Sequence, residues 1–432
     1  MLKHIHVIGL DSFNLEELRS VPHAEDYAFH PLVPYPMIVN PPSYPMESIM
    51  ETAWRELEAA PGVDAIIGHW DFPTTSMLPI LRRAYGLPTP SLDSVLICEN
   101  KYWARLAMRD AVPECTPSFQ HIDPFDEDPW NQVQLDLPFW LKPNVAFSSY
   151  LGFYIESRAR FQEAIRQMRQ GIARFAEPFE YFMDHVEDRE ALPAVGSGGT
   201  GIMEGIIYGD LCTLEGFVLN GKVVVYGVID SLRDPKKGSF FSYQIPSQLP
   251  PEVQNRMIGA AGQVLTRIGL DDTPFNMEFF WNRETDRIWL LEINPRISKS
   301  HCPIFRMTAG ASHHEVAIDI ALRRHPKFPR HEGQFSMAAK FMPRVYEDAQ
   351  VTRAPKPEDI ERLCRRFPEL VVHIHVTEGT RLRNLRNQDS YSFEIADVFL
   401  GGNSEEELHA KFSEVMTLLD FRFSHAVPTN YE

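Results

Sequence analysis

Short apolar runs alternate with helical patterns at the start of the chain. Residues 4–9 and 63–68 are apolar runs that end in glycine, which is typical of buried strands. Residues 46–60 and 77–85 carry apolar positions at helical spacing. Strands that alternate with helices indicate a parallel sheet covered by helices. The pattern therefore predicts a small α/β domain over residues 1–97.

The pattern changes after residue 98, where β runs dominate. The predicted elements are a helix at 99–111, strands at 138–142 and 152–156, a helix at 158–169, strands at 202–207, 212–219 and 222–231, a helix at 252–268, and strands at 275–281 and 287–294. Asn220-Gly221 is a strong hairpin signal between two of these strands. These elements predict a second, mixed domain over residues 98–330.

The last hundred residues predict a third unit of the α+β type, over residues 331–432. Its expected elements are strands near 335–341, 371–376 and 392–400 and a helix at 404–419. Ser404 and Glu407 have the spacing of a capping box at the start of that helix.

Composition and charge narrow the class of protein. The chain has 432 residues and a formal net charge of −17, which argues against a nucleic-acid partner, because phosphate binding needs clustered lysine and arginine. No apolar run is long enough to span a bilayer, so no membrane partner is expected. Five scattered cysteines exclude a disulfide framework and, with no signal-peptide core at the N-terminus, predict a cytoplasmic protein.

The most informative stretch is the pair of apolar runs around the polar turn 282–287. If they pair symmetrically about position 285, Glu278 lies directly opposite Glu292. Like charges at facing positions are destabilising, and an unpaired carboxylate in an apolar strand is costly. A divalent cation between the two glutamates is the simplest solution. The alternative is a different register in which one glutamate faces solvent.

Strand alternation places Glu292, Asn294 and Arg296 on one face. Two carboxylates and an amide suit Mg²⁺, or Mn²⁺, which completes its shell with phosphates and water. Arg296 would then lie beside a metal-bound phosphate and stabilise charge on a transferred phosphoryl group.

Glu278 followed by Leu291-Glu-Ile-Asn-Pro-Arg296-Ile-Ser-Lys-Ser-His301 resembles the signature of the ATP-grasp ligases. Biotin carboxylases and L-amino-acid ligases carry similar runs, and the resemblance extends over roughly residues 63–320. It implies an ATP-grasp fold. Its parts would be a Rossmann-like N-terminal domain, an ATP-grasp domain at 98–330 with a mobile lid subdomain at about 138–207, and a C-terminal α+β lobe.

The resemblance implies a set of phosphate contacts. Lys101 and Lys142 match the family's two ATP-contacting lysines. The loop 144–152 takes the place of the phosphate-covering lid, with Ser148 and Ser149 as contacts. Family lids are usually glycine-rich, whereas this loop has a single glycine.

The segment 204–209 is similar to the hinge that binds adenine. The resemblance implies that Glu204, Gly205 and Ile207 contact the nucleotide. Family members usually place a ribose-binding acid where this chain has Leu211, so Asp210 is the substitute.

Residues 230–246 should line the acceptor site. Arg233, Lys236 or Lys237 could hold a substrate carboxylate, and a solvated basic turn is the equal alternative. His301 could face the substrate or pack within a loop.

The resemblance implies an ATP-dependent carboxylate–amine ligase that forms an acylphosphate and releases ADP and phosphate. The segment Thr377-Glu-Gly-Thr380 and the last helix resemble the closing domain of amino-acid ligases, which favours small amino-acid-like substrates. A biotin-carboxylase-like enzyme and a catalytically inactive nucleotide-binding protein are the alternatives, and a homodimer is left open.

Overall fold

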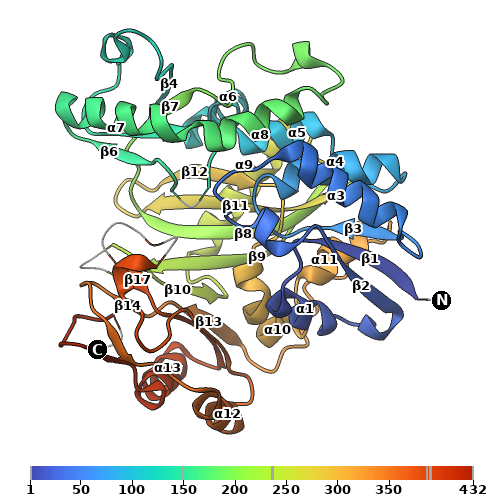
Figure 1. Ribbon diagram of the computed structural model, residues 1–432, viewed down its shortest axis with the longest axis vertical. Coiled ribbons are helices and arrows are strands. Elements are labelled where there is room, and N and C mark those ends of the chain that lie inside the picture. The colour runs from blue at the N-terminus through green and yellow to red at the C-terminus, as the bar shows by residue number, and fades with distance from the viewer. Residues whose placement is uncertain (1, 148, 235–237, 386–387, 389–391, 431–432) are drawn as a thin grey trace.

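The computed structural model describes residues 2–147, 149–234, 238–385, 388 and 392–430. Three main sheets organise them (Figure 1). The N-terminal sheet lies to the right of a long central sheet in this view, a smaller sheet with its helices lies at the top, and the C-terminal residues lie at the bottom. The chain therefore has the α/β and α+β composition that the sequence predicts.

The N-terminal sheet is parallel, with strand order β2-β1-β3. Its strands are β1 (Lys3–Ile8), β2 (Tyr27–Leu32) and β3 (Ala65–Ile67), and its helices are α1 (Ser12–Arg19), α2 (Tyr35–Ile38), α3 (Met46–Glu58) and α4 (Thr74–Ala84). Because the strands are parallel, the loops that follow β1 and β3 lie at the same edge, where the Trp70 indole donates to the Gly9 carbonyl at 2.9 Å. The loop after β3 at this edge also contacts Arg296 through Asp71.

The central sheet has eight antiparallel strands in the order β12-β11-β8-β9-β10-β13-β18-β16. They are β8 (Asp210–Leu219), β9 (Lys222–Arg233), β10 (Phe240–Ile245), β11 (Thr273–Asn282), β12 (Arg287–Asn294), β13 (Met337–Phe341), β16 (Val371–Ile374) and β18 (Ala396–Gly402). Asn220 and Gly221 both have positive φ in the turn between β8 and β9, as the hairpin signal predicts.

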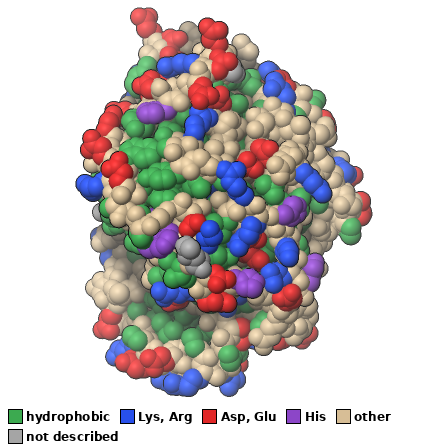
Figure 2. Space-filling model, turned by 90° about the vertical axis from the view of Figure 1, so that its right-hand side faces the viewer, with side chains coloured by type: hydrophobic (Ala, Val, Ile, Leu, Met, Phe, Trp, Pro, Cys, Tyr) green, Lys and Arg blue, Asp and Glu red, His purple; other side chains and the backbone are tan. Residues whose placement is uncertain are grey.

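Helices cover both faces of this sheet. The apolar side chains of α9 (Pro251–Ile268) pack on β8, β11 and β12. The helices α10 (Cys302–Ala309) and α11 (His314–Ala321) pack on the other face with residues of β8, β9, β13 and β18. Acidic and basic side chains are interspersed on the molecular face shown in Figure 2, so the net negative charge does not form one continuous patch there.

A four-stranded antiparallel sheet with order β4-β7-β5-β6 forms the region of the predicted lid. It comprises β4 (Phe119–Ile122), β5 (Phe139–Pro143), β6 (Phe153–Ile155) and β7 (Gly201–Gly205). The helix α7 (Arg158–Gly171) packs on it, whereas α8 (Ala173–Met183) packs on the N-terminal domain. Two helices, α5 (Leu92–Glu99) and α6 (Lys101–Ala111), connect this region to the N-terminal sheet.

The residues after 331 add β13, β18 and β16 to the central sheet rather than forming a separate one. Two short strand pairs, β14 (Arg344–Val345) with β17 (Phe393–Glu394) and β15 (Val351–Arg353) with β19 (Arg422–Phe423), complete this part. Its helices are α12 (Pro357–Arg366) and α13 (Glu405–Leu419), and Ser404 caps α13 by accepting from the Glu407 N–H. The domain boundaries at 97/98 and 330/331 stay predictions.

No helix in the described part of the chain combines the length and the apolarity needed to cross a bilayer. All five cysteines are free thiols, and four of them are buried.

Candidate functional site

Two glutamates face each other on the first two strands of the central sheet. β11 pairs with β12 so that Glu278 lies opposite Glu292, which confirms the register that symmetric pairing predicts. The register then shifts by one residue between Glu278 and Phe279. Met277 and Phe279 pack toward α9, so Glu278 points to the opposite face of the sheet. The polar face of the hairpin therefore carries both carboxylates.

The two carboxylates differ in their partners. Glu292 accepts from the Lys101 ammonium at 3.0 Å, whereas Glu278 forms no ion pair with any residue that the structure describes. Burial and the nearby Glu292 raise the pKa of Glu278. Burial also acts to raise the pKa of Glu292, but Lys101, together with Lys142 and Arg296, outweighs burial and lowers that pKa. One lysine is thus the ion-pair partner available to two facing carboxylates in the described chain. The oxygens of the two carboxylates are ligands that suit a divalent cation.

Asn294 is held by a buried chain of polar groups. Its amide NH₂ donates to the Asn276 carbonyl oxygen at 3.2 Å, and the Asn276 NH₂ donates to Glu215 at 2.7 Å. Glu215 is fully buried, and burial raises its pKa to about 7. Asn276 precedes Glu278 by two residues on the same strand, so strand alternation could have identified it from the sequence.

Arg296 is fixed by a residue from the N-terminal domain. Its Nε donates to the Asp71 carboxylate at 2.7 Å, and its Nη2 donates to the same oxygen. Asp71 lies in the loop after β3, 225 residues away in the sequence. This contact orients the guanidinium beside the carboxylate pair, and no local pattern in the sequence indicates it.

The two predicted phosphate-binding lysines both lie at this site, each beside a glutamate. Lys101 binds Glu292 and also donates to the Ala146 carbonyl at 2.6 Å, at the base of the predicted lid loop. Lys142, at the end of β5, donates to Glu204 on β7 at 2.8 Å. Both ammonium groups act on Glu292, whose pKa they lower.

Glu204 lies at the centre of a second charged cluster, which connects β7 to β12. Arg105 donates to Glu204 at 2.6 Å and to the Leu291 carbonyl at 2.8 Å. Burial would raise the pKa of Glu204, but Arg105 and Lys142 together lower it to about 2. Both Glu204 oxygens are engaged by cations, and Arg105 is a site residue that the sequence reading missed.

The predicted hinge and lid residues are placed near this cluster. The Gly205 N–H donates to the Ser118 carbonyl at 2.8 Å, and the Ile207 side chain is half-buried. Asp210 forms an ion pair with Arg283 at the surface. Ser149 adopts a positive φ in a tight turn that closes on Gly152, whereas Ser148 lies outside the described residues.

The predicted substrate residues occupy different surroundings. Arg233 is exposed and lies 4.7 Å from the centre of the Phe240 ring, whereas Lys236 and Lys237 lie outside the described residues. His301 is 3% exposed, and its Nδ1 lies 2.8 Å from Glu215. Burial lowers the pKa of His301 to about 3. This geometry favours the packed alternative for His301, because the ring supports Glu215 from within the core.

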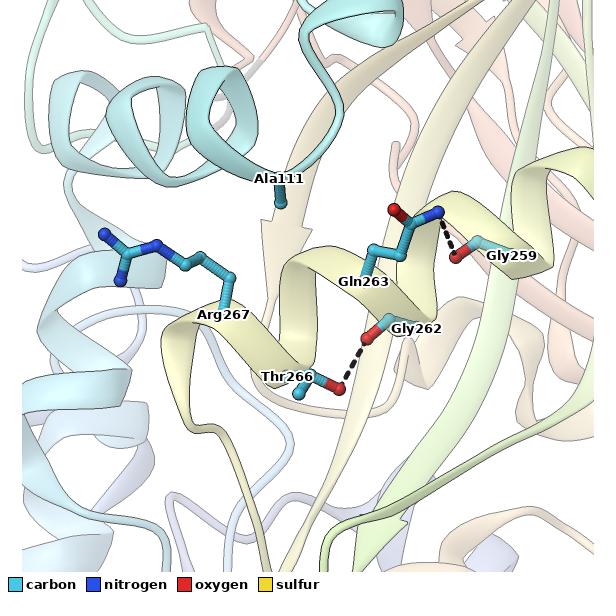
Figure 3. A pocket seen from close by; sticks show the side chains of 6 residues that line it. All are labelled: Ala111, Gly259, Gly262, Gln263, Thr266 and Arg267. Carbon is cyan, nitrogen blue, oxygen red and sulfur yellow. Dashed lines mark hydrogen bonds between the residues drawn. The ribbon is translucent and has the colours of Figure 1, made fainter.

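A shallow depression on another surface lies between the end of α6 and α9 (Figure 3). It is lined by Ala111, Gly259, Gly262, Gln263, Thr266 and Arg267. The Thr266 hydroxyl and the Gln263 amide both bond to carbonyls of their own helix. Its lining brings together no carboxylates, so it offers no chemistry comparable with the hairpin site.

Comparisons with known proteins agree with this geometry. Residues 135–303 match the family model of the ATP-grasp domain, and no curated protein sequence matches the chain. L-amino acid ligase from Bacillus licheniformis is similar in structure, with 15% identity, 98% of this chain and 99% of that chain covered, and a TM-score of 0.71.

Two further solved structures are similar. One is the biotin carboxylase domain dimer of 2-oxoglutarate carboxylase from Hydrogenobacter thermophilus, in complex with MgADP, ADP and bicarbonate (14% identity, 100% and 92% covered, TM-score 0.62). The other is N5-carboxyaminoimidazole ribonucleotide synthetase from Thermus thermophilus (13% identity, 96% and 98% covered, TM-score 0.63). These alignments cover nearly the whole chain, so the chain has the ATP-grasp fold, and residues 135–303 match the ATP-grasp domain.

Proposed function

We propose that this protein is an ATP-dependent carboxylate–amine ligase that forms an amide or peptide bond between small amino-acid-like substrates. The observation that carries the proposal is the facing pair Glu278 and Glu292 with Asn294 and Arg296 beside it. The two carboxylates of this pair have one lysine as their ion-pair partner in the described chain. Oxygen ligands with excess negative charge can bind a metal ion that in turn binds a polyphosphate.

The chain's own groups have separable tasks in this proposal. Glu278, Glu292 and the amide oxygen of Asn294 would hold Mg²⁺ or Mn²⁺. When bound, the metal would offset the charge of the phosphate oxygens. Lys101 and Lys142 would place their ammonium groups on those oxygens. Lys101 is held at the carboxylate pair by Glu292, and Lys142 is held by Glu204.

The remaining groups would bind the nucleotide and exclude water. The backbone of Gly205 and Ile207 would bind adenine, with Glu204 and Asp210 beside them. Ser148 and Ser149 of the loop 144–152 would cover the phosphates. Water exclusion matters because water would hydrolyse an acylphosphate before an amine could attack it.

Arg296 is the group that we assign to the transferred phosphoryl. Its guanidinium is planar, is always charged and is held by Asp71, so it is preorganised to stabilise negative charge as the substrate carboxylate accepts the γ-phosphoryl of ATP. The products of that step are an acylphosphate and ADP. Attack by an amine then releases phosphate.

A screen of amino-acid pairs with ATP and Mg²⁺ tests the proposal, with ADP and phosphate measured as products. We expect ADP and phosphate in equal amounts, together with one amide per ADP. Release of AMP and pyrophosphate would contradict the acylphosphate route. Full turnover by Arg296→Ala would contradict the site assignment.

A biotin-carboxylase-like activity is the second candidate, because a biotin carboxylase domain with MgADP and bicarbonate shares the fold. The loop 144–152 argues against it, since its single glycine differs from the glycine run of biotin carboxylases. ATP cleavage that needs bicarbonate and biotin, without an amine, would favour this candidate. Nucleotide binding without any turnover would favour an inactive binding protein.

We also propose a cytoplasmic location and small-molecule partners only. The support for the location is the set of free thiols, which a reducing compartment preserves. A homodimer is the oligomeric state that we would test first, by light scattering after size exclusion, because one structural neighbour is described as a dimer.

A further inference from the structure

Lys299, near the proposed catalytic arginine, is a cation without an ion-pair partner among the residues that the structure describes. It follows β12 by five residues, and its ammonium lies 4.8 Å from the centre of the Trp70 ring. Within the described residues its ammonium forms no ion pair and no hydrogen bond. The side chain is partly buried, and an unpaired charge in such a position is costly. A cation placed at this cost indicates an anion that the chain itself does not supply.

The carboxylates that face Lys299 are already occupied. Asp71 binds Arg296, and Asp11 caps α1 by accepting from the Asn14 N–H at 2.7 Å. Asp397 forms an ion pair with Lys340 at 2.7 Å. Burial lowers the pKa of Lys299, and the nearby Lys340 lowers it further, against the opposing effect of these carboxylates. None of these three carboxylates therefore forms an ion pair with Lys299.

His69 supplies a second, independent observation at the same place. The residue is 2% exposed, and neither ring nitrogen has a hydrogen-bond partner in the described part of the chain. Its ring lies between Trp70, at 5.2 Å, and His314, at 5.1 Å. Burial, with Lys299 and Arg296 nearby, lowers the pKa of His69 to about 3, so the ring is neutral and offers one donor and one acceptor. Buried polar groups are normally satisfied, so these two nitrogens also indicate a bound group.

The fold places both residues where ligands commonly bind. His69, Trp70 and Asp71 follow β3, and Asp11 follows β1, at the carboxyl ends of a parallel sheet. In open α/β sheets, ligands bind at this edge. Here the edge meets Arg296 directly through Asp71, so a molecule bound at Lys299 would lie next to the group that is transferred.

We propose that Lys299 and His69 form the subsite for the amine substrate, and that this amine carries its own carboxylate, which Lys299 binds. The inference rests on the proposed ligase function and specifies one of its substrates. The Trp70 indole would shield the ion pair from water on one side. An α-amino acid has the required chemistry, whereas a simple amine or an amino-acid amide lacks the anionic group.

Calorimetric titration tests this subsite independently of turnover. The probes are L-amino acids and their α-amides, each titrated into the full chain with Mg²⁺ and a non-hydrolysable ATP analogue. We expect at least one free acid to bind about 10-fold or more tightly than its amide. Lys299→Met should abolish that difference, and Lys299→Arg should retain most of it.

Lys222→Met, at the exposed first position of β9, is the matched control and should behave as the wild type. His69→Ala should weaken the binding of free acids and of amides to the same extent, because the neutral ring does not interact with the charge of the carboxylate. Equal binding of acid and amide to the wild type, no binding of either, or an unchanged preference in Lys299→Met would each overturn the proposal.

Kinetics separate this inference from the proposed function. If ADP is released with an amine and Lys299→Met raises the KM for the free acid alone, both stand. If ADP is released and Lys299→Met lowers kcat equally for acids and amides, the ligase stands and the subsite falls, because Lys299 would then act on the activated carboxylate. If the binding preference follows Lys299 but no ADP is released, the subsite stands and the ligase falls.

Discussion

Two clusters of acidic side chains lie at opposite ends of the central sheet, and they differ in charge balance. At one end Glu278 and Glu292 face each other across β11 and β12 with Lys101 as their one ion-pair partner in the described chain. Near the other end, possible ligand atoms of His375, Glu394 and Asp397 lie within 4.8 Å of one another. On oxygen ligands alone, either cluster could be proposed as a metal site.

The chain's own cations distinguish them. Asp397 is bound by Lys340, and Glu394 is bound by Arg344. Burial would lower the pKa of His375, but Asp397 and Glu394 raise it to about 9, so the ring is a cation near neutral pH and cannot ligate a metal. The second cluster is therefore neutralised from within, whereas the hairpin site needs an external cation.

Removal of one carboxylate from each cluster gives the largest expected contrast. Glu292→Gln should reduce kcat by about 1000-fold, because it removes a proposed metal ligand and the partner of Lys101. Glu394→Gln, the matched change in the second cluster, should leave kcat within a few-fold. Steady-state ADP release measures both variants, and equal losses would contradict the distinction.

Changes that keep a positive charge at Arg296 but alter its geometry should lower kcat less than Glu292→Gln does. Arg296→Lys should lower kcat by about 100-fold, because an ammonium cannot reproduce the planar fork. Asp71→Asn should lower kcat by about 10-fold, since it weakens the contact that orients Arg296. Both should leave the KM for ATP nearly unchanged, and a selective rise in that KM would indicate a nucleotide-binding role instead.

Metal binding should depend on pH at the hairpin site. The pKa of Glu278 is raised in the folded protein, so this carboxyl stays protonated to higher pH than a free glutamate, and protons compete with the metal. Addition of Mg²⁺ should therefore raise the Tm more at pH 8 than at pH 5, by about 2 °C at the higher pH. The Tm of Glu278→Gln should no longer rise when Mg²⁺ is added, whereas the Tm of Glu394→Gln should rise as in the wild type.

A change in the second cluster should have the smallest effect on the Tm. Its stabilising contribution should fall as the pH rises, whereas the effect of Mg²⁺ at the hairpin site should grow. The folded pKa of His375 is about 9, above the value of about 6.5 for an unfolded histidine. Its stabilising contribution is fully present below pH 6.5 and is lost as the pH rises through 9. The Tm of the wild type should exceed that of His375→Gln at pH 6, and the gap should close by pH 10. The same change at the exposed His425 should leave no such gap.

The hairpin at 273–294 is the part of the site that the sequence predicts best. Its strands are adjacent in the chain, so a short turn sets the register, and alternation sets the face of each residue. For that reason Glu278, Glu292 and Asn294 were identifiable without a structure. The same local logic predicts most strands and helices of the fold.

Some elements were missed because tertiary contacts override local signals. The helix α8 contains Pro178, which normally interrupts a helix, yet Phe175, Phe179 and Phe182 bury themselves against the N-terminal domain and maintain it. The short strand β10 is stabilised by β9 and β13, and β13 lies about a hundred residues later in the sequence. Pairings of this kind leave little trace in a local pattern.

The sequence by itself determined the fold class, the facing carboxylates and the position of Arg296, since each depends on strand periodicity and neighbouring residues. Only the tertiary structure decided which cations meet which carboxylates. It brought Asp71 to Arg296, Arg105 to Glu204 and Lys340 to Asp397, and it left Lys299 without a counter-ion among the described residues. Charge balance acts over a few ångströms in space and not along the chain, so it is visible only once the chain has folded.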